Sequence, residues 1–386
     1  MNKIGISTVF TGYNYGSALQ AFATCKIVES LGFNSELMGL RGSVVKGRDV
    51  RIGKLCALAF KTLTHPSNLK NNINTYHSTM TKPIPAESVQ KFDEFTQQYL
   101  NPVRYSMQEL RHKAKTTEYF AFICGSDQIW NSSTYYVDPF YYLRFAPINK
   151  RVSFAPSFGR DYVPEYNWNK IKKYVGEVPF RSVRETSAVD IIEKMTGEKP
   201  TVLIDPTLIL NANEWIESLD LSVNAPAEQV PYILAYFLDR PNDHAMGYVK
   251  QLAKFTGFRV IGIPYEFEGY NYCDEIVSAG PREFVELIRK AAVVCTDSFH
   301  GTAFSMNFHV PFYTFDRNYG SAEKQSTRIV SLLQLTGMLD RLNPKAFSSS
   351  YHCDFTESSM VLQNIGMKAK EYLMTSFRQI KENVPK

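Results

Sequence analysis

The chain has 386 residues, more than twice the length of one ordinary domain, so at least two hydrophobic cores are expected. Hydrophobic residues make up 44% and charged residues 21% of the sequence, which excludes a disordered chain and a collagen-like repeat. The net charge of +5 is too small to indicate nucleic-acid binding. Charge is unevenly distributed, because residues 41–82 hold eight basic residues and one acidic residue.

The first half of the chain alternates between strand-like and helix-like stretches. A β-rich stretch and a turn rich in Gly and Asn precede helical spacing that ends at Gly32, which is the first unit of an α/β sheet. The apolar stretch 120–130 breaks into the polar turn GSDQ. We expect strands within 3–10, 36–40, 120–130, 151–159 and 179–185, and helices within 18–32, 168–175 and 186–195.

A basic amphipathic helix is predicted at 48–63. Its apolar residues recur at helical spacing and form one stripe, with lysines off the stripe. The stripe consists of Ile52, Leu55, Cys56, Ala59, Phe60 and Leu63. Such a stripe either packs on the first domain or contacts an anionic membrane, whose headgroups Arg48, Arg51, Lys54 and Lys61 would meet.

The second half repeats the α/β pattern after an expected linker at 196–200. Strands are predicted within 201–210, 230–238, 258–265, 291–301 and 311–317, and helices within 243–255, 282–290 and 326–337. The last thirty residues read as one helix that returns to the first domain. The predicted regions are an N-terminal Rossmann-like domain at 1–198, a second at 199–355 and a C-terminal helix at 356–386.

The segment SFHG (298–301) is the most informative one for function. A buried strand delivers Asp297, Ser298 and His300 to its carboxyl end, and a helix is expected to start near Thr302. Free N–H groups at such a helix start bind phosphate, and an imidazole beside them transfers protons. Gly301 would permit close approach. The alternative is that Ser298 caps the helix and His300 is a satisfied loop residue.

Other candidates are weaker alone. Arg184 in SVRE (182–185) either binds an anion or pairs with a nearby glutamate. Three cations follow this segment: Arg317, Lys324 and Arg328. They would bind a multiply charged anion, although charged side chains of this kind usually lie on the solvated surface. In the first domain, the candidates lie in two turns: Asn14, Tyr15 and Gly16 in one, and Asp127 and Gln128 in the other. The alternative is that these residues only form a turn and cap a helix.

Neither a metal nor a cofactor is expected. The six cysteines form no CxxC pair, and Asp205 and Asp297 lack the clustered carboxylates that a hard cation requires. The first residues lack the apolar run of a secretory signal, and no stretch is long enough to span a bilayer. The expected location is therefore the cytoplasm, and the amphipathic helix would place the protein at the inner face of the membrane if it binds there.

Several motifs in order resemble those of the polysaccharide pyruvyl transferase family. They are NYGSALQAFAT (14–24), ICGSDQIWN (123–131), SFAPSFG (153–159), SVRETSA (182–188), IDPTLIL (204–210), CTDSFHGTAFS (295–305) and STRIVSLL (326–333). The resemblance implies a GT-B-like fold, in which two Rossmann-like domains face each other across a cleft. It also implies phosphoenolpyruvate as donor, held mainly by the second domain, and a sugar of a cell-surface glycan precursor as acceptor.

The resemblance assigns donor-site roles to Arg184 and His300, with a later cation at Arg317 or Lys324. Formation of a pyruvate ketal then makes His300 the candidate general acid, or the group that stabilises the departing phosphate, and Asp127 the best candidate to accept a hydroxyl proton. The acceptor is expected to be a glycan precursor such as a lipid-diphosphate-linked oligosaccharide. The alternatives are a GT-B glycosyltransferase that uses a nucleotide sugar and a non-catalytic glycan-binding protein.

Overall fold

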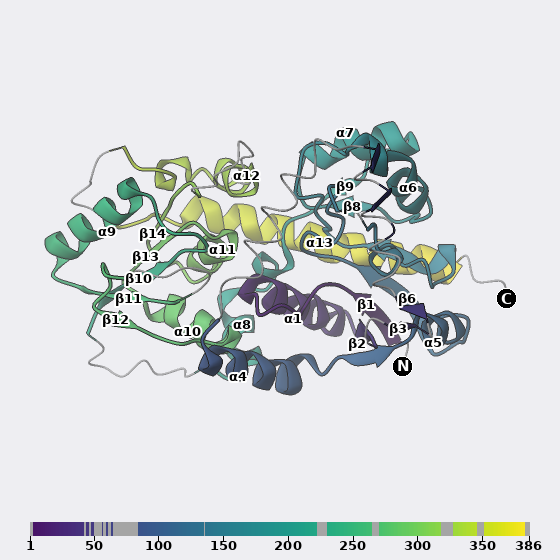
Figure 1. The fold of residues 1–386 in the computed structure, drawn as a ribbon, viewed down its shortest axis with the longest axis horizontal. Helices are drawn as coiled ribbons and strands as arrows, with labels where there is room; N and C mark the ends of the chain where they lie inside the picture. The colour runs from purple at the N-terminus through teal and green to yellow at the C-terminus, as the bar shows by residue number, and fades with distance from the viewer. Residues whose placement is uncertain are drawn as a thin grey trace.

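The computed structural model describes residues 3–41, 44–45, 48–49, 56, 59–60, 63–64, 84–134, 136–221, 230–264, 270–317, 327–345 and 351–382. The first half is built on a five-stranded sheet in the order β5-β2-β1-β6-β7, with all neighbours parallel (Figure 1). Its strands are β1 Lys3–Ser7, β2 Asn34–Leu40, β5 Val103–Tyr105, β6 Tyr119–Cys124 and β7 Arg151–Ser153. The chain turns from one side of β1 to the other at β6, so polar loops gather at the carboxyl ends of these two strands.

Helices cover this sheet and extend it. They are α1 Tyr15–Ser30, α4 Ala86–Phe95 with a π-helical turn Thr96–Leu100, α5 Met107–Lys113, α6 Glu165–Gly176 and α7 Ser187–Thr196. Asn14 caps α1, because its side-chain oxygen accepts a hydrogen bond from Ser17 N at 3.0 Å. Gly32 follows α1 at φ +85°, in the left-handed region that ends many helices. A further parallel pair, β8 Ser182–Val183 and β9 Thr201–Val202, flanks α7.

The second half repeats the same strand arrangement. Its sheet has the order β12-β11-β10-β13-β14, again entirely parallel. The strands are β10 Tyr232–Tyr236, β11 Arg259–Gly262, β12 Glu275–Ile276, β13 Val293–Thr296 and β14 Phe312–Thr314, and the helices are α8 Ala212–Ser218, α9 Asp243–Thr256, α10 Pro281–Lys290, α11 Phe299–Asn307 and α12 Thr327–Leu335. The prediction of two Rossmann-like halves is therefore confirmed.

The long helix α13, Thr356–Glu382, crosses from the second half to the first (Figure 1). Near its start, the ring of Phe355 lies beside that of Phe312 in β14, with 6.4 Å between centroids. Near its end, the Phe377 ring lies 4.8 Å from that of Phe33, and the Tyr372 hydroxyl donates to the Ser153 carbonyl oxygen at 3.0 Å. The predicted return of the C-terminal helix to the first half is confirmed.

One apolar cluster joins both halves. It contains residues of α1, α10, α11 and α13, whereas two further clusters lie within the separate halves. Tyr15 stacks on Phe284 of α10 with 4.5 Å between ring centroids and donates its hydroxyl to the Ala279 carbonyl oxygen at 2.9 Å. Side chains of α1 therefore hold the second half directly against the first.

One predicted strand was wrong, and the start of one predicted helix was wrong. Only Thr201–Val202 of the expected strand 201–210 is extended, and it pairs with β8; Asp205 and Pro206 then turn the chain into a 3₁₀-helix, Pro206–Leu208. In the predicted helix 48–63, Arg48–Asp49 instead pair as β4 with β3 Val44–Val45.

The helix is present at residues 56, 59–60 and 63–64, and the remainder of that prediction lies outside the described residues. The region boundaries at 198 and 355 stay a prediction.

Candidate active site

Four titratable side chains meet where the two halves join. Asp127 follows β6, Arg184 follows β8, Asp205 follows β9, and His300 lies in the first turn of α11. Asp205 Oδ2 pairs with Arg184 Nη1, lies 3.8 Å from His300 Nε2 and accepts a hydrogen bond from Ser126 Oγ at 3.4 Å. Arg184 Nη2 lies 3.9 Å from Asp127 Oδ1. The structure thus brings together the three predicted catalytic residues, Asp127, Arg184 and His300, and places Asp205, which was not predicted as catalytic, between the last two.

Arg184 is buried and only partly satisfied. Among the described residues, neither its Nε nor its Nη2 has a hydrogen-bond partner. Its guanidinium carbon lies 5.3 Å from the centre of the Phe299 ring. Burial lowers the pKa of Arg184, but the carboxylates of Asp205 and Asp127 outweigh burial and raise it, so the guanidinium is always charged. The N–H groups of these two nitrogens can bind an anion.

Helix α11 starts three residues earlier than predicted. Ser298 is its cap and accepts a hydrogen bond from Gly301 N at 3.3 Å, so His300 belongs to the first turn instead of a loop before the helix. Within the described part of the chain, His300 Nε2 has no hydrogen-bond partner. The imidazole is nine-tenths buried. Its Nε2 lies 3.8 Å from Oδ2 of Asp205, which is too far for a hydrogen bond.

Gly16 lets His300 reach the first half. A Cβ atom at Gly16 would lie 2.0 Å from His300 Nδ1, which is too close for two atoms that are not bonded. Any larger residue in this turn of α1 would push the imidazole away. Gly16 therefore allows this approach by having no side chain, and its predicted contact with substrate stays a prediction.

Asp127 is held as a carboxylate. It lies at φ +60°, a left-handed conformation that Asp tolerates better than most residues. Ser17 Oγ donates to its Oδ2 at 2.7 Å, and the backbone N of Gln128 donates to its Oδ1 at 2.8 Å. Burial raises the pKa of Asp127, but the charges of Arg184 and His300 outweigh burial and lower it. The group can therefore accept a proton.

A cavity of about 700 Å³ opens beside Asp127. Three predicted substrate-binding or catalytic residues line it: Asn14, Asp127 and Gln128. The other lining side chains are amide, carboxylate, hydroxyl, aromatic and apolar groups: Val9, Ser17, Ile129, Asn131, Thr134, Tyr136, Val137, Asp138, Tyr141 and Tyr142. This volume falls in the range of small-molecule sites. Polar groups and aromatic faces together suit a hydroxylated ring.

The structure does not bring every predicted residue to this place. Tyr15 is buried in the contact between the halves. The Thr302 hydroxyl is shared with that of Thr314 at 2.8 Å, and Gly301 serves close packing, because a Cβ there would lie 2.6 Å from Thr296 Oγ1. Thr302 and Gly301, like Ser298, help to hold α11 in place, whereas Tyr15 packs against α10.

The predicted cations separate. Arg328 lies near the cluster, with its guanidinium carbon 5.9 Å from the centre of the Phe299 ring, on which Arg184 also lies. Arg317 lies farther along the strand ends, 3.3 Å from Asp239 and 3.6 Å from Asp297. Lys324 lies outside the described residues. Of the described pair, Arg328 is thus the cation placed beside the same ring as Arg184.

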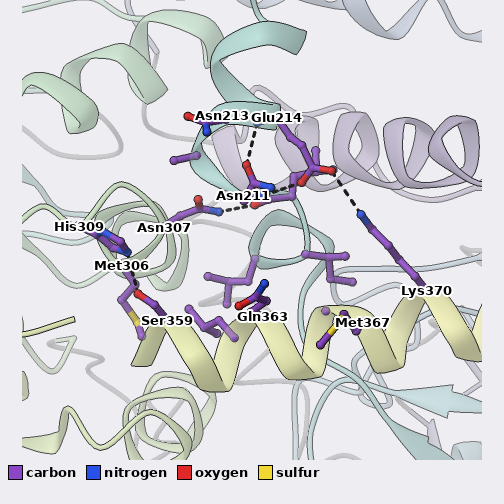
Figure 2. Close-up of a pocket in the computed structure, with 16 residues that line it drawn as sticks. Asn211, Asn213, Glu214, Met306, Asn307, His309, Ser359, Gln363, Met367 and Lys370 are labelled. Atoms are coloured by element: carbon purple, nitrogen blue, oxygen red, sulfur yellow. Dashed lines mark hydrogen bonds and ion pairs between the residues drawn. The ribbon is translucent and has the colours of Figure 1, made fainter. Parts of the chain in front are cut away.

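A second cavity, of about 600 Å³, lies at the opposite end of α11 (Figure 2). It is bounded by the segment around α8, the end of α11 and the first half of α13. Its polar groups pair with one another: Glu214 with Lys370 at 3.3 Å, and His309 with Ser359 at 2.8 Å. None of the predicted site residues lines it, so the candidate active site is the buried cluster with the first cavity.

Sequence reasoning missed three participants. Asp205 was considered only as a metal ligand, although an Asp before Pro at the end of an apolar run is a capping signal. Ser17 and Phe299 gave no signal of their own, because their contacts with Asp127 and Arg184 depend on the folded arrangement. Within the described residues, no group of three or more His, Cys, Asp or Glu is arranged to hold a metal ion, and a metal-free reaction stays a prediction.

The model of one protein family matches most of the chain. The polysaccharide pyruvyl transferase model aligns with residues 14–319, a span that includes Asp127, Arg184, Asp205 and His300. The chain belongs to this family. It is accordingly a transferase enzyme, as the motifs predicted, and a polysaccharide is the acceptor class that membership in the polysaccharide pyruvyl transferase family implies. No curated protein matches the sequence significantly.

Several solved structures resemble the fold of this polysaccharide pyruvyl transferase. MnaA of Staphylococcus aureus, solved with UDP, has a TM-score of 0.47 and 10% identity, covering 99% of this chain and 91% of its own. UDP-GlcNAc 2-epimerase of Neisseria meningitidis, bound to UDP-GlcNAc, has a TM-score of 0.46 and 10% identity, covering 97% and 100%. These likenesses say nothing about the reaction. In the described residues, no helix has the length and apolar character needed to cross a membrane.

Proposed function

We propose that this enzyme transfers pyruvate from phosphoenolpyruvate to two hydroxyls of a hexose in a cell-surface polysaccharide precursor, with release of phosphate. The observation that carries the proposal is the placement of Arg184 and His300 on one carboxylate, each with at least one side-chain nitrogen that has no hydrogen-bond partner among the described residues. An anionic donor would satisfy these groups. Arg328 and the first N–H groups of α11 supply further positive potential.

The acceptor side of the proposal rests on the first cavity. Its amide groups can hydrogen-bond sugar hydroxyls, and its tyrosine rings offer apolar faces to a sugar ring. Asp127 both lines this cavity and faces Arg184. A hydroxyl bound there would therefore lie between the carboxylate that can take its proton and the cluster that would bind the donor.

The proposed chemistry uses these groups in sequence. His300 delivers a proton to C3 of phosphoenolpyruvate, and the first acceptor oxygen attacks C2 as Asp127 accepts its proton. The C2–O bond to phosphate breaks, and the second hydroxyl attacks the resulting oxocarbenium ion to close the ketal. Of the two hydroxyl protons, one balances the new methyl group and the other leaves with phosphate.

Phosphate release from phosphoenolpyruvate, measured against a panel of lipid-diphosphate-linked oligosaccharides, tests the proposal. Acceptor-dependent release is the expected result. A thermal-shift screen separates the alternatives, since a ligand that binds the native state raises the melting temperature. Stabilisation by nucleotide sugars without any by phosphoenolpyruvate would indicate a glycosyltransferase instead, and glycan binding without phosphate release a non-catalytic protein.

We also propose that the enzyme docks weakly on anionic membranes at the cytoplasmic face, where a lipid-linked acceptor would reside. Phe60 and Leu63 belong to the predicted apolar stripe and are 68% and 82% exposed, so these side chains do not pack on the first half. Each basic residue of the surrounding segment near an anionic surface would contribute about 1 kcal/mol.

Sedimentation with anionic vesicles at low and high salt measures this docking. Wild-type protein should pellet at low salt only. Phe60→Ser combined with Leu63→Ser should abolish pelleting, whereas Phe255→Ser, which removes an exposed phenylalanine of α9, should not. Absence of pelleting by the wild type at low salt would contradict membrane docking.

A further inference from the structure

Asp205 is the one residue of the cluster that contacts both Arg184 and His300, and the proposed reaction gives it no chemical step. It is 1% exposed and caps the 3₁₀-helix Pro206–Leu208. Thr207 donates two hydrogen bonds to its Oδ1, from the backbone N at 3.0 Å and from Oγ1 at 2.8 Å. One oxygen is thereby fixed by the turn, and the orientation of the whole carboxylate is set before any ligand arrives.

The other oxygen, Oδ2, faces the functional groups. It pairs with Nη1 of Arg184, which belongs to the first half, and lies 3.8 Å from Nε2 of His300, which belongs to the second. Burial raises the pKa of Asp205, but His300 and Arg184 outweigh burial and hold that pKa well below its usual range. The carboxylate is therefore charged whenever the enzyme is folded near neutral pH.

A purely structural carboxylate would be expected to satisfy the donors around it, because a buried donor without a partner is costly. Asp205 leaves Nε and Nη2 of Arg184 and Nε2 of His300 without a hydrogen bond from any described residue. Asp205 binds Nη1 of Arg184 and leaves Nε and Nη2 available to a ligand. This geometry is that of a carboxylate that orients the neighbouring side chains.

We propose that Asp205 is a positioning residue, which fixes Arg184 and His300 relative to each other across the junction of the two halves so that both contact the donor. The inference rests on the proposed function for the identity of the donor. The motif IDPTLIL (204–210) contains Asp205, and the structure adds a role for it: the turn after β9 delivers a negative charge between the two halves.

Asp205→Asn tests the proposal, because it keeps the shape and the cap but places an uncharged amide against Arg184. The expected result is a fall in kcat/KM for phosphoenolpyruvate of about 10²-fold, since small misplacements of reacting groups have effects of this size. Asp354→Asn is the matched control. Asp354 likewise accepts two hydrogen bonds from the threonine two residues later, from Thr356 N at 2.9 Å and from Thr356 Oγ1 at 2.7 Å, and its loss should leave the affinity for phosphoenolpyruvate unchanged.

A crystal structure of Asp205→Asn decides the positioning role without reference to activity. Displacement of the Arg184 guanidinium and the His300 imidazole supports the proposal. Retention of both side chains in place overturns it, as would equal loss of donor affinity in Asp205→Asn and Asp354→Asn. If the wild type does not bind phosphoenolpyruvate at all, the proposed function fails, and the displacement in the crystal still decides the role of Asp205.

Discussion

Two carboxylates surround the single guanidinium at the centre of the site. Asp127, Asp205 and Arg184 together carry one net negative charge, which opposes a multiply charged donor. Binding of such a donor is therefore expected to need further positive charge. Arg328, on the same phenylalanine ring as Arg184, adds a cation at the edge.

His300→Ala should lower turnover by about 10²- to 10⁴-fold, the range for loss of a general acid, without unfolding the protein. Phosphate release from phosphoenolpyruvate measures it. His300→Gln separates two roles, since an amide can hydrogen-bond phosphate but cannot donate a proton as an acid. Substantial activity of His300→Gln would assign His300 to anion binding. His309→Ala, at the opposite end of α11, is the control and should retain full turnover.

At the scale of elements, the contact between α1 and α11 depends on a glycine, Gly16, which has no side chain. Gly16→Ala would place a methyl group where the imidazole of His300 lies. We expect a loss of about 1–3 kcal/mol in the free energy of unfolding from overpacking, and a large fall in turnover as the ring moves. Urea unfolding and phosphate release measure the two effects.

Gly247→Ala provides the comparison for this experiment. Gly247 lies within α9, and a Cβ there would meet no atom within 4 Å, so alanine should raise the free energy of unfolding by about 0.4–1 kcal/mol. If Gly16→Ala behaves like Gly247→Ala, the close approach of His300 to α1 is wrong.

The elements that carry the site could be predicted to different extents. The strand ends at GSDQ and SFHG follow long apolar runs, so their position at the sheet edge was readable from periodicity. The segment 201–210 was not, because its apolar residues suggest a strand while Asp205 and Pro206 turn the chain after two paired residues. The start of α11 was misplaced because the Ser at 298 and the Thr four residues later could each mark the beginning of a helix.

Contacts between the halves were beyond sequence reasoning. Tyr15 stands in a Gly- and Asn-bearing turn that suggests a ligand loop, yet its ring is buried against Phe284, 269 positions later in the sequence. Nothing local to either residue reveals such a pairing. The same holds for Gly16 with His300 and for Asp205 with Arg184, which explains why the motifs located the site but not its internal arrangement.

At the scale of the whole molecule, Asp297 is expected to make stability depend on pH. Burial raises its pKa to about 6, although Arg317 and two backbone N–H groups favour the charged form. A carboxyl whose pKa is higher in the folded state binds a proton there more readily, so its contribution is full below about pH 4 and is lost as the pH rises through 6. The loss is at most about 3 kcal/mol in the free energy of unfolding.

Denaturant unfolding between pH 4.5 and pH 6.5 checks this expectation. As the pH rises, the unfolding free energy of the wild type should fall relative to that of Asp297→Asn. Asp127 and Asp205 have lowered pKa values, so their contribution is lost only below the ordinary carboxyl range and does not enter this window. A difference that stays constant with pH would contradict the raised pKa of Asp297.

The path of α13 also has a consequence for synthesis of the protein on the ribosome. Phe33 and Phe120 leave the ribosome early, but the ring that covers them, Phe377, is added more than two hundred and fifty residues after the second of them. At about 5–20 residues per second, the nascent first half waits more than ten seconds with this apolar surface open to water. We expect this half to be a target for chaperones during translation, and the enzyme to reach its active form only after release of the finished chain.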